Sequence, residues 1–224
     1  MTRGKSLQYT FVGMDKALAL HRKIGLKKFP EKVVEIIWTH CKIVADICMV
    51  VADKFEANGG KNVDREMLFS GALVHDIGAY KCFDKRFIPK KNYMRHQYEG
   101  WKILKNEGWD ERIANMALRH TPLLDFQLKN LSMKFKEEEI KPQNLEEEIL
   151  AYADIFHSKG RPRFNEFEQY VSFLDSIDKR CSEIAREYRE KFGEFDTKIW
   201  EANYLVWHRD VNKWIDDFKV SREI

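Results

Sequence analysis

Glycine and proline are scarce in this chain, which contains 11 and 5 of them among 224 residues. Because these residues form a large share of turns, a fold of many short strands is disfavoured, whereas the abundant Lys, Glu, Leu and Ile favour helices. The cysteines include no Cys-x-x-Cys pair that would indicate a structural zinc site, and we expect reduced thiols at Cys41, Cys48, Cys82 and Cys181. The composition therefore predicts an all-α fold without disulfides.

The chain also lacks an excess of one charge and any long apolar run. It has 39 Lys and Arg against 36 Asp and Glu, a net charge of +3, which gives no reason to expect a nucleic-acid polymer or a membrane surface as partner. Charged side chains interrupt the first 25 residues, and the longest uncharged apolar run near them, Ile47–Ala52, is far too short to cross a bilayer. We therefore expect a cytoplasmic protein that contacts no membrane.

Apolar residues at helical spacing, together with capping residues, predict successive helices. The clearest is 31–56, which follows Pro30 and ends before two consecutive glycines. A break at 160–165 divides the chain into a main domain, 1–160, and a helical C-terminal extension, 161–224, packed on it. A surface loop or short helix is expected between 121 and 144, and further helices are predicted over 64–75, 95–107, 110–119 and 144–157.

The extension carries an aromatic stripe with alternating spacings of four and three, made of Trp200, Tyr204, Trp207, Val211, Trp214 and Phe218. We expect this face of the helix to pack on the main domain. Two alternatives stay open at this stage: the stripe forms a homodimer interface, or it covers a pocket as a lid.

Histidines and aspartates recur on or next to successive predicted helices, often among apolar residues, as His40, His75, Asp76, His96, His120 and Asp154. His40 lies on the buried stripe of helix 31–56, where a lone histidine is usually structural. A buried aspartate, however, is costly without a cation or several hydrogen-bond donors, and six such residues in series are not explained by structure alone. Imidazole with carboxylate suits Mn, Fe, Co, Ni or Zn better than Mg, so the series predicts a site for divalent metal ions.

The order of these residues resembles the HD superfamily of metal-dependent phosphohydrolases, and His75-Asp76-Ile77-Gly78 matches its HDIG variant. The resemblance covers about residues 30–160. It implies an HD-type helical bundle in which Asp76 bridges two divalent ions and is the central catalytic residue. The first ion is implied to be held by His40, His75, Asp76 and Asp154, and the second by Asp76 with His96 and His120.

The residues that contact the phosphate are indicated less directly. Many HDIG proteins place Lys or Arg directly after the motif glycine, where this chain has Ala79, so Lys81 is a substitute only if the loop curls back. Residues three and four apart share a helix face, and the segment after Asp154 offers His157, Ser158, Lys159 and Arg163 as candidate substrate contacts. The alternative is that His157 and Arg163 cap the end of the helix and Lys159 is solvated.

We therefore expect a hydrolase of a phosphate ester, acting on a nucleotide or another small phosphorylated metabolite through a metal-bound hydroxide. The resemblance disfavours the cyclic-dinucleotide phosphodiesterases of the superfamily, because their Gly-Tyr-Pro motif is missing from this chain. Two alternatives stay open: a di-iron oxygenase with the same ligand order, and a non-catalytic, metal-stabilised binding module.

Overall fold

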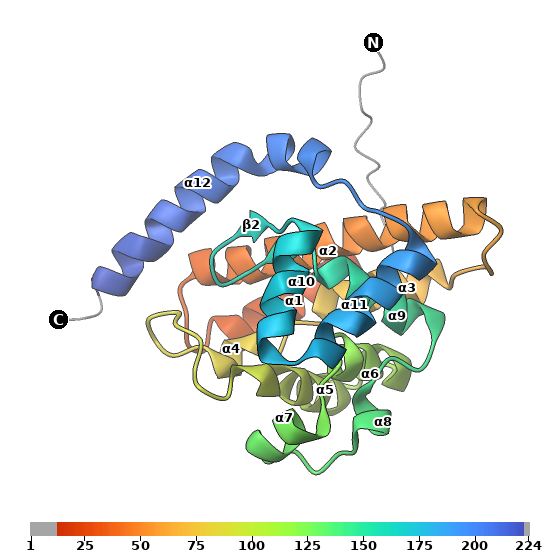
Figure 1. Cartoon of the computed structure of the whole chain (residues 1–224). Coiled ribbons are helices and arrows are strands. Elements are labelled where there is room, and N and C mark those ends of the chain that lie inside the picture. Colours follow the sequence, from red (N-terminus) through yellow and green to blue (C-terminus); the bar gives the residue numbers. More distant parts are fainter. Residues whose placement is uncertain (1–12, 222–224) are drawn as a thin grey trace.

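A computed structural model describes residues 13–221, and almost all regular structure in that range is helical (Figure 1). A two-stranded hairpin, β1 (His157–Ser158) and β2 (Arg163–Phe164), separates two groups of helices. The helices before it are α1 (Met14–Gly25), α2 (Glu31–Ala57), α3 (Arg65–Val74), α4 (Ala79–Cys82), the 3-10 helix η1 (Tyr93–Arg95), α5 (His96–Asn106), α6 (Glu111–Arg119), α7 (Asp125–Asn130), α8 (Glu137–Ile140) and α9 (Leu145–Asp154). Those after it are α10 (Phe167–Ile177), α11 (Lys179–Phe192) and α12 (Lys198–Val220). The all-α class is confirmed; residues 1–12 of the predicted 1–160 domain lie outside the described range.

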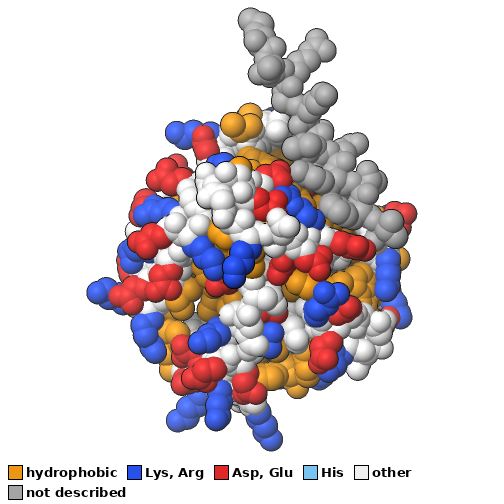
Figure 2. All heavy atoms as spheres, turned by 90° about the vertical axis from the view of Figure 1, so that its right-hand side faces the viewer, with side chains coloured by type: hydrophobic (Ala, Val, Ile, Leu, Met, Phe, Trp, Pro, Cys, Tyr) orange, Lys and Arg blue, Asp and Glu red, His pale blue; other side chains and the backbone are white. Residues whose placement is uncertain are grey.

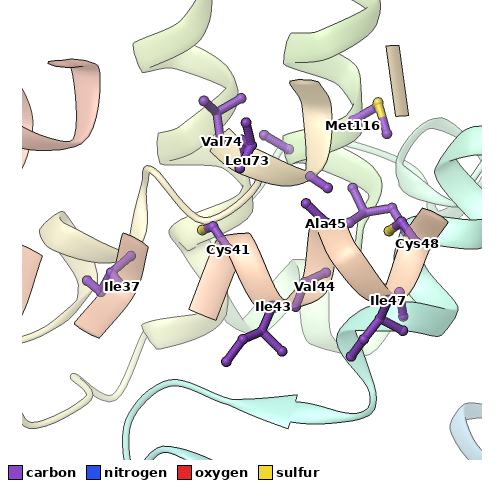
Figure 3. Close-up of a cluster of buried hydrophobic side chains, with 14 of the residues drawn as sticks. Ile37, Cys41, Ile43, Val44, Ala45, Ile47, Cys48, Leu73, Val74 and Met116 are labelled. Carbon is purple, nitrogen blue, oxygen red and sulfur yellow. The ribbon is translucent and has the colours of Figure 1, made fainter. Parts of the chain in front are cut away.

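Helix α2 forms the centre of the core, because apolar side chains surround most of it. Its buried residues include Ile36, Ile37, Val44 and Ile47, none of which is exposed to solvent. Figure 3 shows side chains of α2 together with Leu73 and Val74 of α3 and Met116 of α6. A helix that is apolar on nearly all sides is enclosed by its neighbours. His40, the polar side chain on the enclosed side in the middle of α2, is fully buried for this reason.

Short polar side chains fix the points at which several helices begin. The side chains of Asp64, Asp110 and Asn144 accept hydrogen bonds from backbone N–H groups one or two residues into α3, α6 and α9, at 3.0, 2.8 and 2.9 Å. The helices predicted from 31, 64, 95 and 110 match α2, α3, α5 and α6 to within two residues at each end. These boundaries matter for the site, since His75 directly follows α3 and Asp154 is the last residue of α9.

The predicted helix 144–157 was too long, since α9 ends at Asp154 and the chain turns into the hairpin. His157 pairs with Phe164 and Ser158 with the residue before it, in antiparallel register. The backbone N–H and the side-chain amide of Asn165 donate to the carbonyls of residues 156 and 155, at 3.0 and 2.8 Å. Carbonyls at the end of α9 are thereby satisfied without another helical turn. The expectation that His157 and Ser158 share a helix face with Asp154 was wrong for this reason.

The C-terminal helices lie against the outside of the bundle. Helix α11 packs on α9 and α2, and α12 runs along one flank of the molecule (Figure 1). The indole N–H of Trp207 donates to Glu35 of α2 at 3.1 Å, and Val211 and Ile215 are buried. The aromatic stripe thus contacts the main body of the same chain. A homodimer interface on this helix stays a prediction.

The surface carries both signs of charge. On the face drawn in Figure 2, Lys and Arg side chains are interspersed with Asp and Glu. Within residues 13–221, no helix combines the length and the apolar character that crossing a bilayer requires.

Candidate metal centre

The six predicted metal ligands meet inside the bundle. One lies in the middle of α2, two directly follow α3, one begins α5, one directly follows α6 and one ends α9, namely His40, His75, Asp76, His96, His120 and Asp154. The side chain of Asp154 is 15% exposed, whereas the other five are buried. The cluster therefore meets solvent on the side of Asp154.

The carboxylate of Asp76 lies at the centre of the cluster. Its Oδ2 atom is 3.1 Å from His40 Nε2 and 3.5 Å from His75 Nε2. Its Oδ1 atom is 3.3 Å from His96 Nε2 and 3.8 Å from His120 Nε2. Each oxygen of one carboxylate thus faces two imidazoles, which divides the ligands into two groups joined by Asp76.

The carboxylate of Asp154 completes the first group. Its Oδ1 atom is 3.2 Å from His40 Nε2 and 3.4 Å from His75 Nε2. Three buried atoms of this group have no hydrogen-bond partner among the described residues, namely His40 Nε2, His75 Nε2 and Asp154 Oδ1, and neither has Asp76 Oδ1, which faces the second group. Buried polar atoms without partners are costly in a protein interior. Because imidazole nitrogens and carboxylate oxygens are ligands for divalent transition metals, the cluster fits such ions.

Backbone carbonyls orient three of the four imidazoles. The Nδ1 atoms of His75, His96 and His120 lie 2.7, 2.9 and 2.8 Å from the carbonyl oxygen three residues earlier in the chain. A neutral ring that donates its Nδ1–H in this way presents the unprotonated Nε2 atom to the cluster. Local helix geometry therefore selects the tautomer that binds a cation.

His40 is oriented differently, by two further histidines. Its Nδ1 atom lies 2.9 Å from Nδ1 of His157, whose Nε2 atom lies 3.1 Å from Nε2 of His208 on α12. If His40 binds an ion through Nε2, its Nδ1–H donates to His157, which then donates its Nε2–H to His208. Nothing in the sequence pairs His208 with residues 51 and 168 positions earlier.

We expect the variant H208L to bind divalent metal about tenfold more weakly than the wild type, because loss of an outer hydrogen bond typically costs ten- to a hundredfold in affinity. The matched variant H208Q keeps an acceptor near the position of Nε2 and should stay within about twofold of the wild type. Competition with a chromogenic chelator measures both affinities. Equal affinities in the two variants would show that His208 does not orient His40.

The charges around the cluster keep most of its groups in their metal-binding forms. Burial alone would raise the pKa values of Asp76 and Asp154, but Lys159 and the surrounding imidazoles lower both pKa values well below their usual range. Burial lowers the pKa of His96 to about 4 and that of His120 well below its usual range. Ionised carboxylates and neutral imidazoles are the forms that bind metal ions.

Two cationic side chains balance the buried carboxylates. The Lys159 ammonium lies 2.5 Å from Asp76 Oδ2, with the side chain 12% exposed. Although burial works in the opposite direction, the charge of Asp76 raises the pKa values of Lys159 and His75 well above their usual range. A divalent ion that enters the cluster competes with the proton on His75, so we expect its affinity to fall in acid.

The other predicted substrate contacts lie away from the cluster. Lys81 is 51% exposed and pairs with Glu99 at 3.2 Å, so its loop does not curl back toward Asp76. The hydroxyl of Ser158 and the guanidinium of Arg163 both donate to Asn165, at 3.0 and 3.4 Å, within the hairpin. In the structure these two side chains stabilise the hairpin that follows α9.

Tyr93 is a site residue that the sequence did not indicate. Its ring stacks on His96, with centroids 4.7 Å apart, and its buried hydroxyl has no hydrogen-bond partner among the described residues. Lys159 Nζ lies 5.8 Å from the centroid of the same ring. One tyrosine among eight in the sequence carries no motif that would single it out.

Comparison with known proteins yields matches of several kinds. A 30% identical relative, the uncharacterised protein MJ0778 of Methanocaldococcus jannaschii, aligns over 65% of this chain and 76% of its own length. The tRNA (cytidine(56)-2'-O)-methyltransferase of Picrophilus torridus is 27% identical over 70% of this chain, which spans only 45% of that protein. Among solved structures, the HD domain of the L. monocytogenes phosphodiesterase PgpH covers 90% of this chain and 95% of its own, with 19% identity and a TM-score of 0.45.

The family model of the HD domain matches residues 37–159. That range is more than half of the chain, and it contains all six clustered residues as well as Lys159. This confirms the resemblance seen in the sequence: the chain belongs to the HD domain family.

Proposed function

We propose that this protein hydrolyses the phosphate ester of a small metabolite with two divalent ions bound at the cluster. The observation that carries the proposal is the position of Asp76, whose two carboxylate oxygens each face two imidazole Nε2 atoms at 3.1–3.8 Å. His40, His75 and Asp154 would hold one ion with Asp76, and His96 and His120 the other. A carboxylate between two ligand groups can contribute one oxygen to each of two neighbouring ions, and two-ion sites of this kind stabilise the attacking and leaving oxygens of a displacement.

Bound divalent ions would supply Lewis acidity toward phosphoryl oxygens and a lower pKa for water. In the net reaction the water oxygen forms a bond to phosphorus, the ester P–O bond breaks, and the alcohol leaves with a proton from the water. Lys159 is placed to donate to phosphate oxygens, since its ammonium already reaches Asp76. The Tyr93 hydroxyl, which lacks a partner among the described residues, is a second available donor.

The methyltransferase name of one relative is not proposed for this chain, because the chain spans 45% of that protein. What supports hydrolysis instead is a cluster of six metal-ligand side chains, five of them buried, within the HD domain match.

The proposal is tested by measuring metal content and then turnover. Protein stripped with a chelator is reloaded separately with Mn, Fe, Co, Ni, Zn or Mg, and phosphate release is followed for a panel of nucleotides and other phosphorylated metabolites. We expect two ions per chain and release that depends on them. Oxygen uptake by the iron-loaded protein without phosphate release would favour an oxygenase, and metal binding without any turnover would favour a binding module.

Lys159 gives a sharper test of how the phosphate is held. We expect K159A to raise KM at least tenfold with both ions still bound, because a hydrogen bond from a charged group contributes about 1.5–3 kcal/mol. K81A is the matched control and should leave KM unchanged, since Lys81 pairs with Glu99 at the surface. Metal analysis of both variants separates a substrate contact from a loss of ions. An unchanged KM in K159A would show that Lys159 does not contact the substrate and that its role is structural.

A further inference from the structure

A cavity of about 180 Å³ lies beside the metal cluster, and His120 and Asp154 form part of its wall. The other walls come from α9, from the segment after α6, and from α10 and α11 of the C-terminal extension. The apolar lining includes Leu123, Ile155, Leu174, Ile184 and Ala185. Helices α10 and α11 lie outside residues 37–159, so this wall is not part of the HD domain match.

We propose that this cavity receives the organic group of the substrate and that this group is apolar, so that the protein acts on the phosphate monoester of an apolar alcohol. The inference rests on the proposed function, since Asp154 and His120 would place the phosphate at the inner end of the cavity. The apolar group then extends away from the cluster between α9, α10 and α11.

The charge of the lining supports this class of substrate. No Lys or Arg lines the cavity in the part of the chain that the structure describes. The polar lining side chains outside the metal cluster are Thr121, Gln127, Tyr170, Cys181 and Tyr188, which are uncharged at neutral pH. A second phosphate would therefore lack a cationic partner, and most hydroxyls of a sugar would lack hydrogen bonds after losing water.

The size and the mouth of the cavity agree with an apolar group of limited length. An apolar cavity of about 150 Å³ is known to bind benzene, so one of 180 Å³ suits a single aromatic ring or a short branched alkyl group. Phe173 and Ile177 of α10 line it while remaining 58% and 42% exposed. Exposed apolar side chains next to a cavity are typical of a ligand entrance.

The first experiment compares two substrates whose leaving groups are both alcohols. We expect the protein loaded with Mn²⁺ to hydrolyse benzyl phosphate with a kcat/KM at least tenfold higher than that for glycerol 1-phosphate. The preference should lie mostly in KM, because the ring is buried before the reaction begins. Equal kcat/KM values for the two substrates would overturn the inference and leave the proposed function intact.

Two variants that reduce the cavity test the same inference from the protein side. C181F adds a ring at the cavity wall and I177W adds one at the exposed mouth, where folding is not at risk. Both should lower kcat/KM for benzyl phosphate at least tenfold while changing that for glycerol 1-phosphate by less than twofold. E183F places the same added ring on the outer face of α11, where Glu183 is exposed, and should change neither. An equal loss for both substrates in I177W would contradict the assignment.

Binding of benzyl alcohol to the metal-free protein, measured by calorimetry, gives a readout that needs no turnover. We expect binding that C181F and I177W weaken at least tenfold and that E183F leaves unchanged. If no phosphate is released from either ester while this pattern holds, the proposed function fails and the apolar cavity site stands. If benzyl alcohol does not bind and the two esters are hydrolysed equally, the cavity assignment fails and the proposed function stands.

Discussion

Replacing Asp76 by alanine is expected to remove bound metal and phosphate release together while leaving the helical content largely intact. Asp76 contributes an oxygen to each of the two ligand groups, so its loss takes one ligand from each site. Asp76 lies two residues after the last residue of α3, and its side chain caps no described helix. We therefore expect the described helices to keep their packing in the variant. We expect phosphate release to fall at least about a thousandfold, because metal ions supply several kcal/mol of charge stabilisation in such reactions.

The control for D76A is D46A, which removes a carboxylate that pairs with Lys42 at 3.0 Å on α2, outside the cluster. That variant should keep its metal and its activity. Metal analysis, circular dichroism and a phosphate assay on both proteins give the comparison. If D76A retained metal and turned over at the wild-type rate, Asp76 would not be the bridging ligand.

The fold near the metal cluster could be predicted because its signals are local. Asp64, Asp110 and Asn144 cap helices within three residues of their own positions, so the starts of α3, α6 and α9 were visible in the sequence. The order of histidines and aspartates along those helices identified the residues that the structure brings together. The helix starts need information from only a few neighbouring residues, whereas the ligand series was recognised from its order over residues 40–154.

Other parts of the structure depend on contacts between distant segments, and the sequence analysis did not predict them. The strands of the hairpin have two residues each, which is too short for an apolar alternation to be recognised. Helix α1, which the sequence analysis did not anticipate, includes His21, a buried residue held by Tyr80 and the carbonyl of Leu73, at 2.9 Å each. His208 likewise reaches His157 only because α12 folds back along the body.

Replacing Gly78 by alanine is expected to be the most destabilising single change of those considered, although it adds only a methyl group. An added Cβ atom would lie 2.0 Å from the carbonyl oxygen of His96 and 2.3 Å from the backbone nitrogen of Gly100. The φ angle of Gly78 is −74°, so the requirement for glycine comes from the close approach to α5 and not from backbone conformation. Both obstacles are backbone atoms, which cannot rotate away as a flexible side chain can.

Relief of this overlap requires the turn after α3 to separate from α5, which would also move His96 away from Asp76. Overpacking of a core by a few atoms costs about 1–3 kcal/mol, and a clash with backbone should reach at least the upper end of that range. For a chain of this length about 3 kcal/mol lowers Tm by about 6–12 °C. The control is G160A, whose added Cβ would meet nothing nearer than Phe83 at 3.9 Å and should leave Tm unchanged. Thermal unfolding followed by circular dichroism, with metal affinity measured in parallel, tests both effects. If G78A had the Tm and the metal affinity of the wild type, close packing of the turn after α3 on α5 would not be needed to form the cluster.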